Sequence, residues 1–163
     1  FPTRRSSDLH GVSGAGQPGE PLRGPWAGVG GDELARRWGV PRVETWTRIG
    51  STNDRAAELA RSGRAAPDGT AAPEAPLVVI AEEQTAGRGR RGEAWRSAPG
   101  SGIWMSLLLP SGPLDPGLPL VVGAAAAAGI EAVAGDRPPV CVKWPNDLLV
   151  DGRKVGGDRK SVV

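Results

Sequence analysis

The sequence predicts an α+β (α/β) fold in which helices flank a mixed β-sheet. Short apolar runs bounded by glycine, proline or polar residues, such as residues 77–81, are typical of buried strands. Residues 118–134 instead have the length and composition of a helix. Strand-like and helix-like segments alternate without a regular strand–helix–strand rhythm, so a mixed sheet is expected rather than a purely parallel one. The length of 163 residues allows one domain with a substantial core.

The first structured half is expected to hold two helices and one strand. A short helix over residues 32–38 ends at a glycine, and residues 43–49 alternate as a strand does. Ser51 is a candidate N-cap, with Asp54 three residues on as the acidic partner of a capping box. The helix that follows should run to Arg61, with Gly63 as its C-terminal cap.

The second half is expected to hold further strands and one long helix. Residues 77–82 and 102–109 are interpreted as mostly buried strands, and residues 118–134 as a core helix. That helix has 17 residues, fewer than the ~20 that a bilayer span needs. Two short strands around residues 144–147 and a two-residue Asp-Gly hairpin turn complete the pattern.

The two ends of the chain differ in character from its centre. From residue 11 to residue 31, 11 of 21 residues are Gly or Pro, which predicts a flexible leader without a fold. Residues 1–9 resemble translated adapter sequence, and residues 158–163 raise the same suspicion. The predicted organisation is a leader over 1–42 with a short helix near 32–38, a partial domain over 43–157, and a non-native tail over 158–163.

Composition excludes several classes of protein. The net charge of +2 is too small to indicate nucleic-acid binding by bulk electrostatics. One cysteine cannot form an intrachain disulfide. One histidine and one cysteine are too few for a zinc site built from these two residue types. No apolar signal segment is visible at the N-terminus, so a cytoplasmic protein is expected.

The most informative stretch is residues 84–95, which places three arginines among three glycines directly after a predicted strand. Glycines allow main-chain N–H groups to approach a ligand closely, and arginines offer forked donors for carboxylate and phosphate oxygens. The stretch therefore suits a loop that closes over a small anionic ligand. On spacing alone, a solvated basic loop is an equally good interpretation.

Four segments in this order resemble the catalytic domain of biotin–protein ligases. They are Gly-Ser-Thr-Asn at 50–53, the Gly-Arg-Gly-Arg-Arg-Gly box with its tryptophan at 84–95, Lys-Trp-Pro-Asn-Asp at 143–147, and Arg-Lys-Val-Gly-Gly at 153–157. The resemblance implies a fold related to class II aminoacyl-tRNA synthetases and lipoate ligases. It also implies an activity: biotin and ATP form biotinyl-5′-AMP with magnesium, and the biotinyl group passes to a lysine of a biotin carboxyl carrier domain.

The resemblance also implies which residues bind the substrates. The biotin site would include Ser51, Thr52, Asn53 and Gln84. The alternative to ligand binding is a structural role: the first three residues would cap the helix that begins there, and the glutamine would be a surface residue. Arg88, Gly89 and Arg90 would belong to a loop that is mobile when empty and orders over biotin and the adenylate. Arg91 and the tryptophans at 95 and 104 are not expected to contact the ligand.

Further residues would take part in the chemistry. Lys154 matches the lysine at the reacting centre of the family, where its ammonium would hold the biotin carboxylate and stabilise charge on the α-phosphoryl group. Arg88 shares this catalytic role, and Lys143 would give electrostatic support. Asn146 and Asp147 offer oxygen ligands suited to magnesium, or alternatively satisfy the turn after Pro145.

The sequence departs from the family pattern after Gly157. Members continue there with an apolar strand and a small C-terminal β-domain, so the fold is expected to be incomplete and the fragment impaired as an enzyme. The 42 residues before Val43 are too few for the helix-turn-helix domain of some members, so DNA binding is not expected, nor is a membrane partner. The alternatives are a lipoate–protein ligase-like acyl-adenylating enzyme and, from a different class, an RNA-binding module that uses the basic loop.

Overall fold

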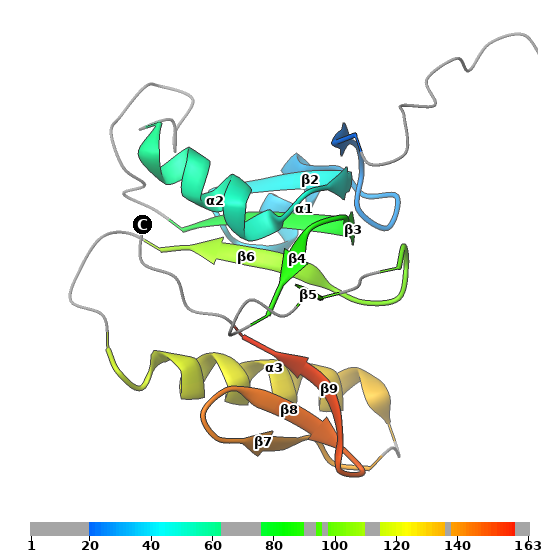
Figure 1. The fold of residues 1–163 in the computed structure, drawn as a ribbon, viewed down its shortest axis with the longest axis vertical. Coiled ribbons are helices and arrows are strands. Elements are labelled where there is room, and N and C mark those ends of the chain that lie inside the picture. The colour runs from blue at the N-terminus through cyan, green and yellow to red at the C-terminus, as the bar shows by residue number, and fades with distance from the viewer. Residues whose placement is uncertain are drawn as a thin grey trace, which may run out of the picture.

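A four-stranded mixed sheet forms the upper part of the fold (Figure 1). The computed structural model describes residues 20–62, 76–89, 94–95, 98–109, 115–135 and 138–158. The sheet has the order β1-β2-β3-β6, with β1 at Leu22–Arg23, β2 at Arg42–Ile49, β3 at Leu77–Gln84 and β6 at Trp104–Leu108. β2 and β3 are parallel, whereas β1 and β6 pair antiparallel with their neighbours. The predicted mixed sheet is confirmed.

Each face of this sheet is covered by one helix. Because successive side chains of a strand point to opposite faces, β3 supplies two apolar surfaces. Leu77 and Val79 pack with Leu59 of α2 (Thr52–Arg61). On the other face, Val78 and Ile80 pack with Leu34 of α1 (Gly31–Trp38).

Both helices begin and end close to the predicted positions. α1 ends at Gly39, whose φ of 64° is the left-handed conformation that glycine adopts without strain. α2 begins at its N-cap Ser51 and reaches Arg61, as predicted. Its C-cap is Ser62, and the predicted cap Gly63 lies outside the described residues.

The described part of the predicted leader is folded, so that prediction is wrong for residues 22–31. β1 pairs with β2, and Trp26 and Val29 form a bridge through two backbone hydrogen bonds. Trp26 also meets Trp38 of α1 edge-to-face, with ring centroids 6.5 Å apart. The many glycines and prolines shape this turn, and the two tryptophans outweigh their disordering tendency.

A second group of elements lies below the large sheet (Figure 1). It consists of α3 (Leu118–Ala134) and a three-stranded antiparallel sheet of β7 (Cys141–Lys143), β8 (Asp147–Val150) and β9 (Arg153–Gly157). The predicted Asp-Gly hairpin joins β8 to β9, with φ of 50° at Asp151 and 71° at Gly152. Positive φ at both residues is what a two-residue turn of this type requires.

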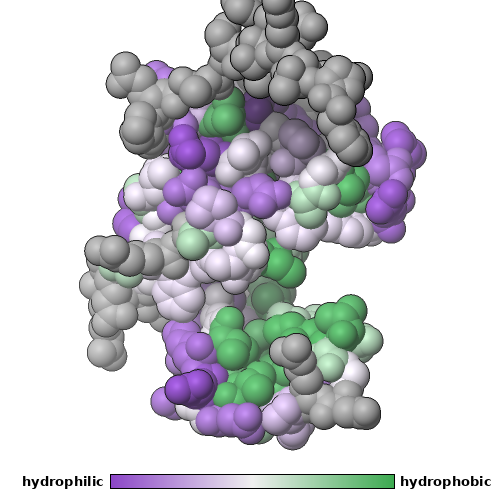
Figure 2. Space-filling view, turned by 90° about the vertical axis from the view of Figure 1, so that its right-hand side faces the viewer, coloured by the Kyte–Doolittle hydropathy of each residue, from purple (hydrophilic) through white to green (hydrophobic). Residues whose placement is uncertain are grey.

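The apolar side chains of α3 and β6 are more exposed than predicted. The bounds of α3 match the prediction, but within it only Gly123 and Ala127 are buried, and in β6 only Leu108 is. The exposed large apolar residues of these segments are Ile103, Met105, Leu107, Leu109, Leu120, Val121, Val122, Ile130 and Val133. Hydrophobic side chains gather over the lower part of the molecule in Figure 2. The prediction of a core helix and a mostly buried strand is therefore wrong for the residues described.

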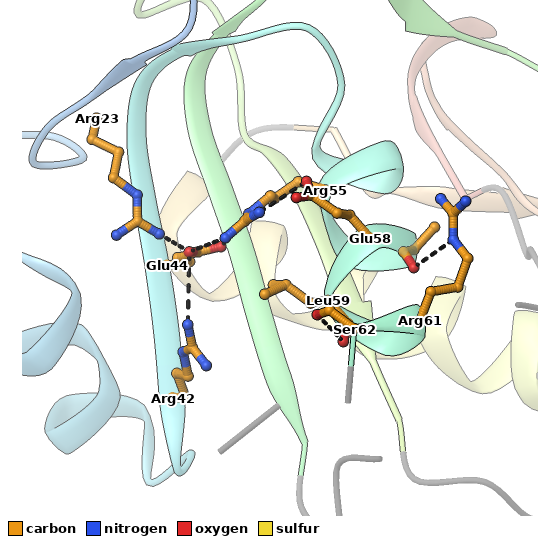
Figure 3. A network of polar contacts seen from close by, with 9 residues as sticks. Arg23, Arg42, Glu44, Arg55, Glu58, Leu59, Arg61 and Ser62 are labelled. Atoms are coloured by element: carbon orange, nitrogen blue, oxygen red, sulfur yellow. Dashed lines mark hydrogen bonds and ion pairs between the residues drawn. The ribbon is translucent and has the colours of Figure 1, made fainter. Parts of the chain in front are cut away.

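Three arginines surround one buried carboxylate in the upper part of the fold (Figure 3). Glu44 of β2 is 4% exposed and accepts two hydrogen bonds from Arg55 of α2, at 2.9 and 3.0 Å. Arg23 and Arg42 also pair with Glu44. Burial, followed by the positive charges of Arg55 and Arg42, lowers the pKa of Arg23. The cluster ties β1, β2 and α2 together, and its charges compensate for the burial of Glu44.

Within the described residues, no helix is both long and apolar enough to cross a membrane. The single cysteine, Cys141, is exposed as a free thiol on β7.

Candidate active site

The candidate site lies at the edge of the large sheet where β2 and β3 end. Because these strands are parallel, the segments that follow them leave from the same edge. Two backbone hydrogen bonds keep those segments together: Thr85 N–H donates to the Ile49 carbonyl at 2.9 Å, and Ala86 N–H donates to the Gly50 carbonyl at 2.7 Å. The predicted Ser-Thr-Asn segment and the predicted glycine-arginine stretch are thus neighbours.

The N-terminus of α2 is held by side chains from three elements. Ser51 Oγ accepts from the Asp54 N–H at 3.4 Å, so the predicted N-cap is confirmed. Gln84 Oε1 accepts from the Thr52 N–H at 2.8 Å and from the Thr52 hydroxyl at 3.1 Å. Ser106 of β6 donates its hydroxyl hydrogen to Thr52 Oγ1 at 2.9 Å. Ser51 and Gln84 therefore do bind free groups at the start of α2, which was the alternative to a role in binding biotin. The same contacts also orient Ser51, Thr52 and Gln84 at the sheet edge beside Asn53.

Arg88 reaches across to this helix terminus. It lies on β4 (Gly87–Arg88), which pairs antiparallel with β5 (Ala94–Trp95). The Arg88 guanidinium donates to the Asp54 carboxylate, one residue beyond Asn53. Gly87 allows the close pairing of the two strands, because a Cβ there would lie 2.8 Å from the Trp95 carbonyl oxygen. Gly89 follows directly, whereas the predicted site residue Arg90 lies outside the described residues.

Lys154 approaches the same β4–β5 pair from the three-stranded sheet. Its ammonium lies 5.5 Å from the centroid of the Trp95 ring and 2.7 Å from Asp147 Oδ1. Trp95 in turn meets Trp104 edge-to-face, with centroids 6.4 Å apart. Figure 1 shows β4 and β5 between the two sheets, with β9 rising toward them. The β4–β5 pair therefore brings Arg88 and Lys154, 66 positions apart in the numbering, to one region.

The side chains of Asn146 and Asp147 already have protein partners. Asn146 is 6% exposed, and its Nδ2 donates to the Asp158 carbonyl at 2.7 Å. The Asp158 N–H donates back to the Asn146 carbonyl at 3.2 Å, and the Asp147 carboxylate pairs with Lys154. No group of three or more His, Cys, Asp or Glu side chains within the described residues could hold a metal ion. The Asp147 carboxylate is thus engaged by Lys154, and the metal role of Asn146 and Asp147 stays a prediction.

Lys143 lies at the end of β7, directly opposite Asp147 in the β7–β8 ladder. Residues opposite each other in an antiparallel pair share a face of the sheet. Lys143 is exposed, and its supporting role also stays a prediction.

A family model matches residues 58–160, more than half of the chain, and its description is biotin/lipoate A/B protein ligase family. The chain belongs to that family. The matched region includes Gln84, Arg88, Lys143 and Lys154 of the candidate site. The resemblance to the catalytic domain of biotin–protein ligases, predicted from the four motifs, is confirmed.

Curated relatives agree with this assignment. The bifunctional ligase/repressor BirA of Bacillus spizizenii is 46% identical over 112 residues, which cover 67% of this chain and 31% of the relative. The biotin–[acetyl-CoA-carboxylase] ligase of Mycobacterium tuberculosis is 32% identical over 137 residues, which cover 73% of this chain and 44% of the relative. The chain thus spans less than half of the length of these relatives.

Solved structures of biotin ligases share the fold. The biotin protein ligase of Leishmania major in complex with biotinyl-5-AMP matches with a TM-score of 0.55 and 29% identity, over 72% of this chain and 50% of that one. A biotin acetyl coenzyme A carboxylase synthetase from Helicobacter pylori, at 24% identity and a TM-score of 0.58, supports the fold alone. The α+β fold of biotin protein ligases, predicted from the resemblance, is confirmed. The expectation that DNA is not a partner stays a prediction, since the Bacillus relative is named as a repressor as well as a ligase.

Two residues of the site were missed by sequence reasoning about ligands. Asp54 was interpreted only as a capping residue, and Ser106 only as one position of a strand. Their contacts with Arg88 and Thr52 span 34 and 54 positions, and no local pattern encodes such a distant pairing.

Proposed function

We propose that this chain is part of an enzyme that uses ATP to attach biotin to a lysine of a biotin carboxyl carrier domain, through biotinyl-5′-AMP. One observation supports the proposal most strongly. In this member of the family, residues from separate motifs come together around β4 and β5. Arg88 lies beside the N-terminus of α2, and Lys154 lies against Trp95. Two cations and a polar helix terminus suit substrates that are both anions.

The proposed reaction has two steps. In the first, a carboxylate oxygen of biotin attacks the α-phosphorus of ATP, the bond to the β-phosphate breaks, and pyrophosphate leaves. In the second, the neutral amine of the carrier lysine attacks the carbonyl carbon of the mixed anhydride. AMP leaves with the bonding electrons, and the amine loses a proton to solvent.

The residues of the site have distinct proposed roles in the first step. Lys154 holds the biotin carboxylate against the α-phosphate and offsets the repulsion between the two anions. Arg88 on β4 has the same proposed role, and Lys143 adds positive potential. Ser51, Thr52, Asn53, Gln84, Gly89 and Arg90 are proposed to bind biotin and the adenylate. The amide of Gln84 suits the ureido ring of biotin because it offers both a donor and an acceptor.

Magnesium enters the proposal as the cation that accompanies ATP phosphates. It neutralises phosphate charge when bound. Asn146 and Asp147 are the residues proposed for it, and Asp147 would have to exchange its contact with Lys154 for the metal. No step above depends on this exchange.

A cytoplasmic location belongs to the same proposal. Cys141 is an exposed free thiol, and exposed thiols persist in reducing compartments.

Lipoate is the competing acyl substrate, because the family description names both ligands. RNA binding by the basic loop is the competing function of another class. The named relatives and the structure with biotinyl-5-AMP favour biotin over both.

The test is carrier labelling by the complete protein. With ATP, magnesium and radiolabelled biotin, we expect label to pass from a biotinyl-AMP intermediate to the carrier lysine. Equimolar lipoate should not compete, and RNA should not be retained at physiological salt. Labelling with lipoate instead of biotin, or no acyl-adenylate with either acid, would contradict the proposal.

A further inference from the structure

Asp54 is the anionic partner of the candidate cation Arg88 among the described residues, and no motif of the family resemblance includes it. The two side chains form an ion pair across 34 positions, with Asp54 in the first turn of α2 and Arg88 on β4. Both remain accessible, with 53% of the Asp54 side chain and 44% of the Arg88 side chain exposed. A dissolved anion can therefore reach the guanidinium while Asp54 holds it.

The backbone of each partner is fixed independently of the pair. The Asp54 N–H donates to the Ser51 cap, and Arg88 is paired with Ala94 in the β4–β5 ladder. A change of partner by Arg88 therefore needs only side-chain rotation. It does not require α2 or β4 to move.

Release of Arg88 leaves Asp54 in a favourable place. A carboxylate in the first turn of a helix interacts well with the free N–H groups and with the positive end of the helix dipole. The cost of separating an exposed ion pair is also small. The pair is thus strong enough to orient Arg88 and weak enough to give it up.

We propose that Asp54 is the partner of Arg88 in the absence of ligand, and that it competes with the anionic ligand for the guanidinium. This inference rests on the proposed function for the identity of the ligand, the carboxylate of biotin or the adenylate phosphate. The competition itself concerns any anion that binds Arg88. It predicts that removal of the Asp54 charge strengthens ligand binding through Arg88 and through no other group.

The first experiment measures biotin binding to the complete protein by titration calorimetry. Asp54→Asn should lower the Kd about threefold at low salt, the size of effect expected for an exposed ion pair. The difference should disappear near 0.5 M salt. In a double-mutant cycle, Asp54→Asn should have no effect when Arg88 is already alanine. Asp54→Glu, which keeps the charge, should resemble the parent.

Glu58→Gln is the matched control. Glu58 lies one turn further along the same helix and pairs with Arg55 at 2.8 Å. Its loss removes the same charge from α2, so it should leave the Kd for biotin within the experimental error. In turnover, the KM for biotin should fall with Asp54→Asn while kcat stays within about twofold, because the pair is absent from the ligand complex.

The second experiment needs no substrate. Modification of Arg88 by phenylglyoxal, mapped by mass spectrometry, should be about threefold faster in Asp54→Asn than in the parent or in Glu58→Gln. Inorganic phosphate should slow the reaction in all three proteins. A parent in which Arg88 is modified as fast as in Asp54→Asn would show that Asp54 does not occupy the guanidinium and would overturn the inference, whatever the substrate is.

Two binding results would also overturn the inference. One is weaker biotin binding by Asp54→Asn, which would make Asp54 a brace or a ligand contact. The other is an equal gain in affinity from Asp54→Asn when Arg88 is already alanine. That result would mean that Asp54 weakens binding by repelling the anionic ligand directly. If the parent binds no biotin while the phenylglyoxal result holds, the proposed function fails and the competition at Arg88 stands.

Discussion

The ammonium of Lys154 lies 5.5 Å from the centroid of the Trp95 ring, and this contact joins the three-stranded sheet to the β4–β5 pair. The face of an indole attracts a cation through its quadrupole. Trp95 also meets Trp104 edge-to-face, so it packs against β6. Its contact with the Lys154 ammonium gives it a further role, the orientation of that side chain relative to Asp147.

Replacement of Trp95 tests this orientation. Trp95→Leu removes the aromatic face, so the rate of biotin adenylation should fall about fivefold, as expected from a cation–π contact of ~1 kcal/mol. Trp95→Phe keeps an aromatic face and should retain most of the rate. The rates come from single-turnover formation of biotinyl-AMP. Equal rates for the two variants would show that the ring face is irrelevant.

The pairing of β4 with β5 should depend on Gly87. In Gly87→Ala, the new methyl group would lie 2.8 Å from the Trp95 carbonyl oxygen, so the pair must open and both Arg88 and Trp95 shift. Biotin affinity should fall about tenfold or more, measured by calorimetry. Gly129→Ala on α3 is the control, because a Cβ there meets nothing within 4 Å. It should leave binding unchanged and raise stability by up to ~1 kcal/mol. Normal binding by Gly87→Ala would disprove the steric argument.

The Glu44 cluster should stabilise the fold without contributing to chemistry. Glu44→Gln leaves Arg23, Arg42 and Arg55 around a neutral side chain, so the free energy of unfolding should fall by about 2 kcal/mol. Urea denaturation measures this change. Glu33→Gln, which removes exposed ion pairs on α1, should lower the stability much less than Glu44→Gln does. Equal effects of the two substitutions would mean that the burial of Glu44 does not matter.

The exposed apolar residues of α3 should make these 163 residues self-associate when produced alone. Contiguous apolar surface of this kind binds other apolar surfaces. Val121→Lys with Val133→Lys should lower both the binding of a hydrophobic dye and the apparent mass in sedimentation. Leu22→Lys, on β1, is the control and should change neither. If the unsubstituted 163 residues sediment as a monomer and bind no dye, the prediction is wrong.

The sequence predicted the strands, helices and turns well where local signals are strong. Ser51 caps α2, Gly39 ends α1, and the Asp-Gly turn has the expected conformation. Burial was predicted poorly for α3. Its apolar composition indicates that the helix favours an apolar environment, but it does not show which segment covers the helix. The folded turn around Trp26 was missed for a different reason, since the ring contact of Trp26 with Trp38 and the pairing of β1 with β2 are non-local.

The candidate site was predicted as a set of residues but not as an arrangement. The motifs named Thr52, Arg88 and Lys154, and the resemblance gave them roles. The contacts that orient them come from Ser106, Asp54 and Trp95, which lie on other elements. Tertiary pairing of this kind follows from strand order and register, which no single motif encodes.

Biotin-dependent exchange of pyrophosphate into ATP tests the central claim most directly, because it reports the first step without a carrier protein. The complete protein should exchange only when biotin is present, and Lys154→Ala should reduce the rate by at least ~100-fold. Arg153→Ala, which removes the neighbouring exposed charge on β9, should stay near the parental rate. Exchange without biotin, or a parental rate in Lys154→Ala, would contradict the account.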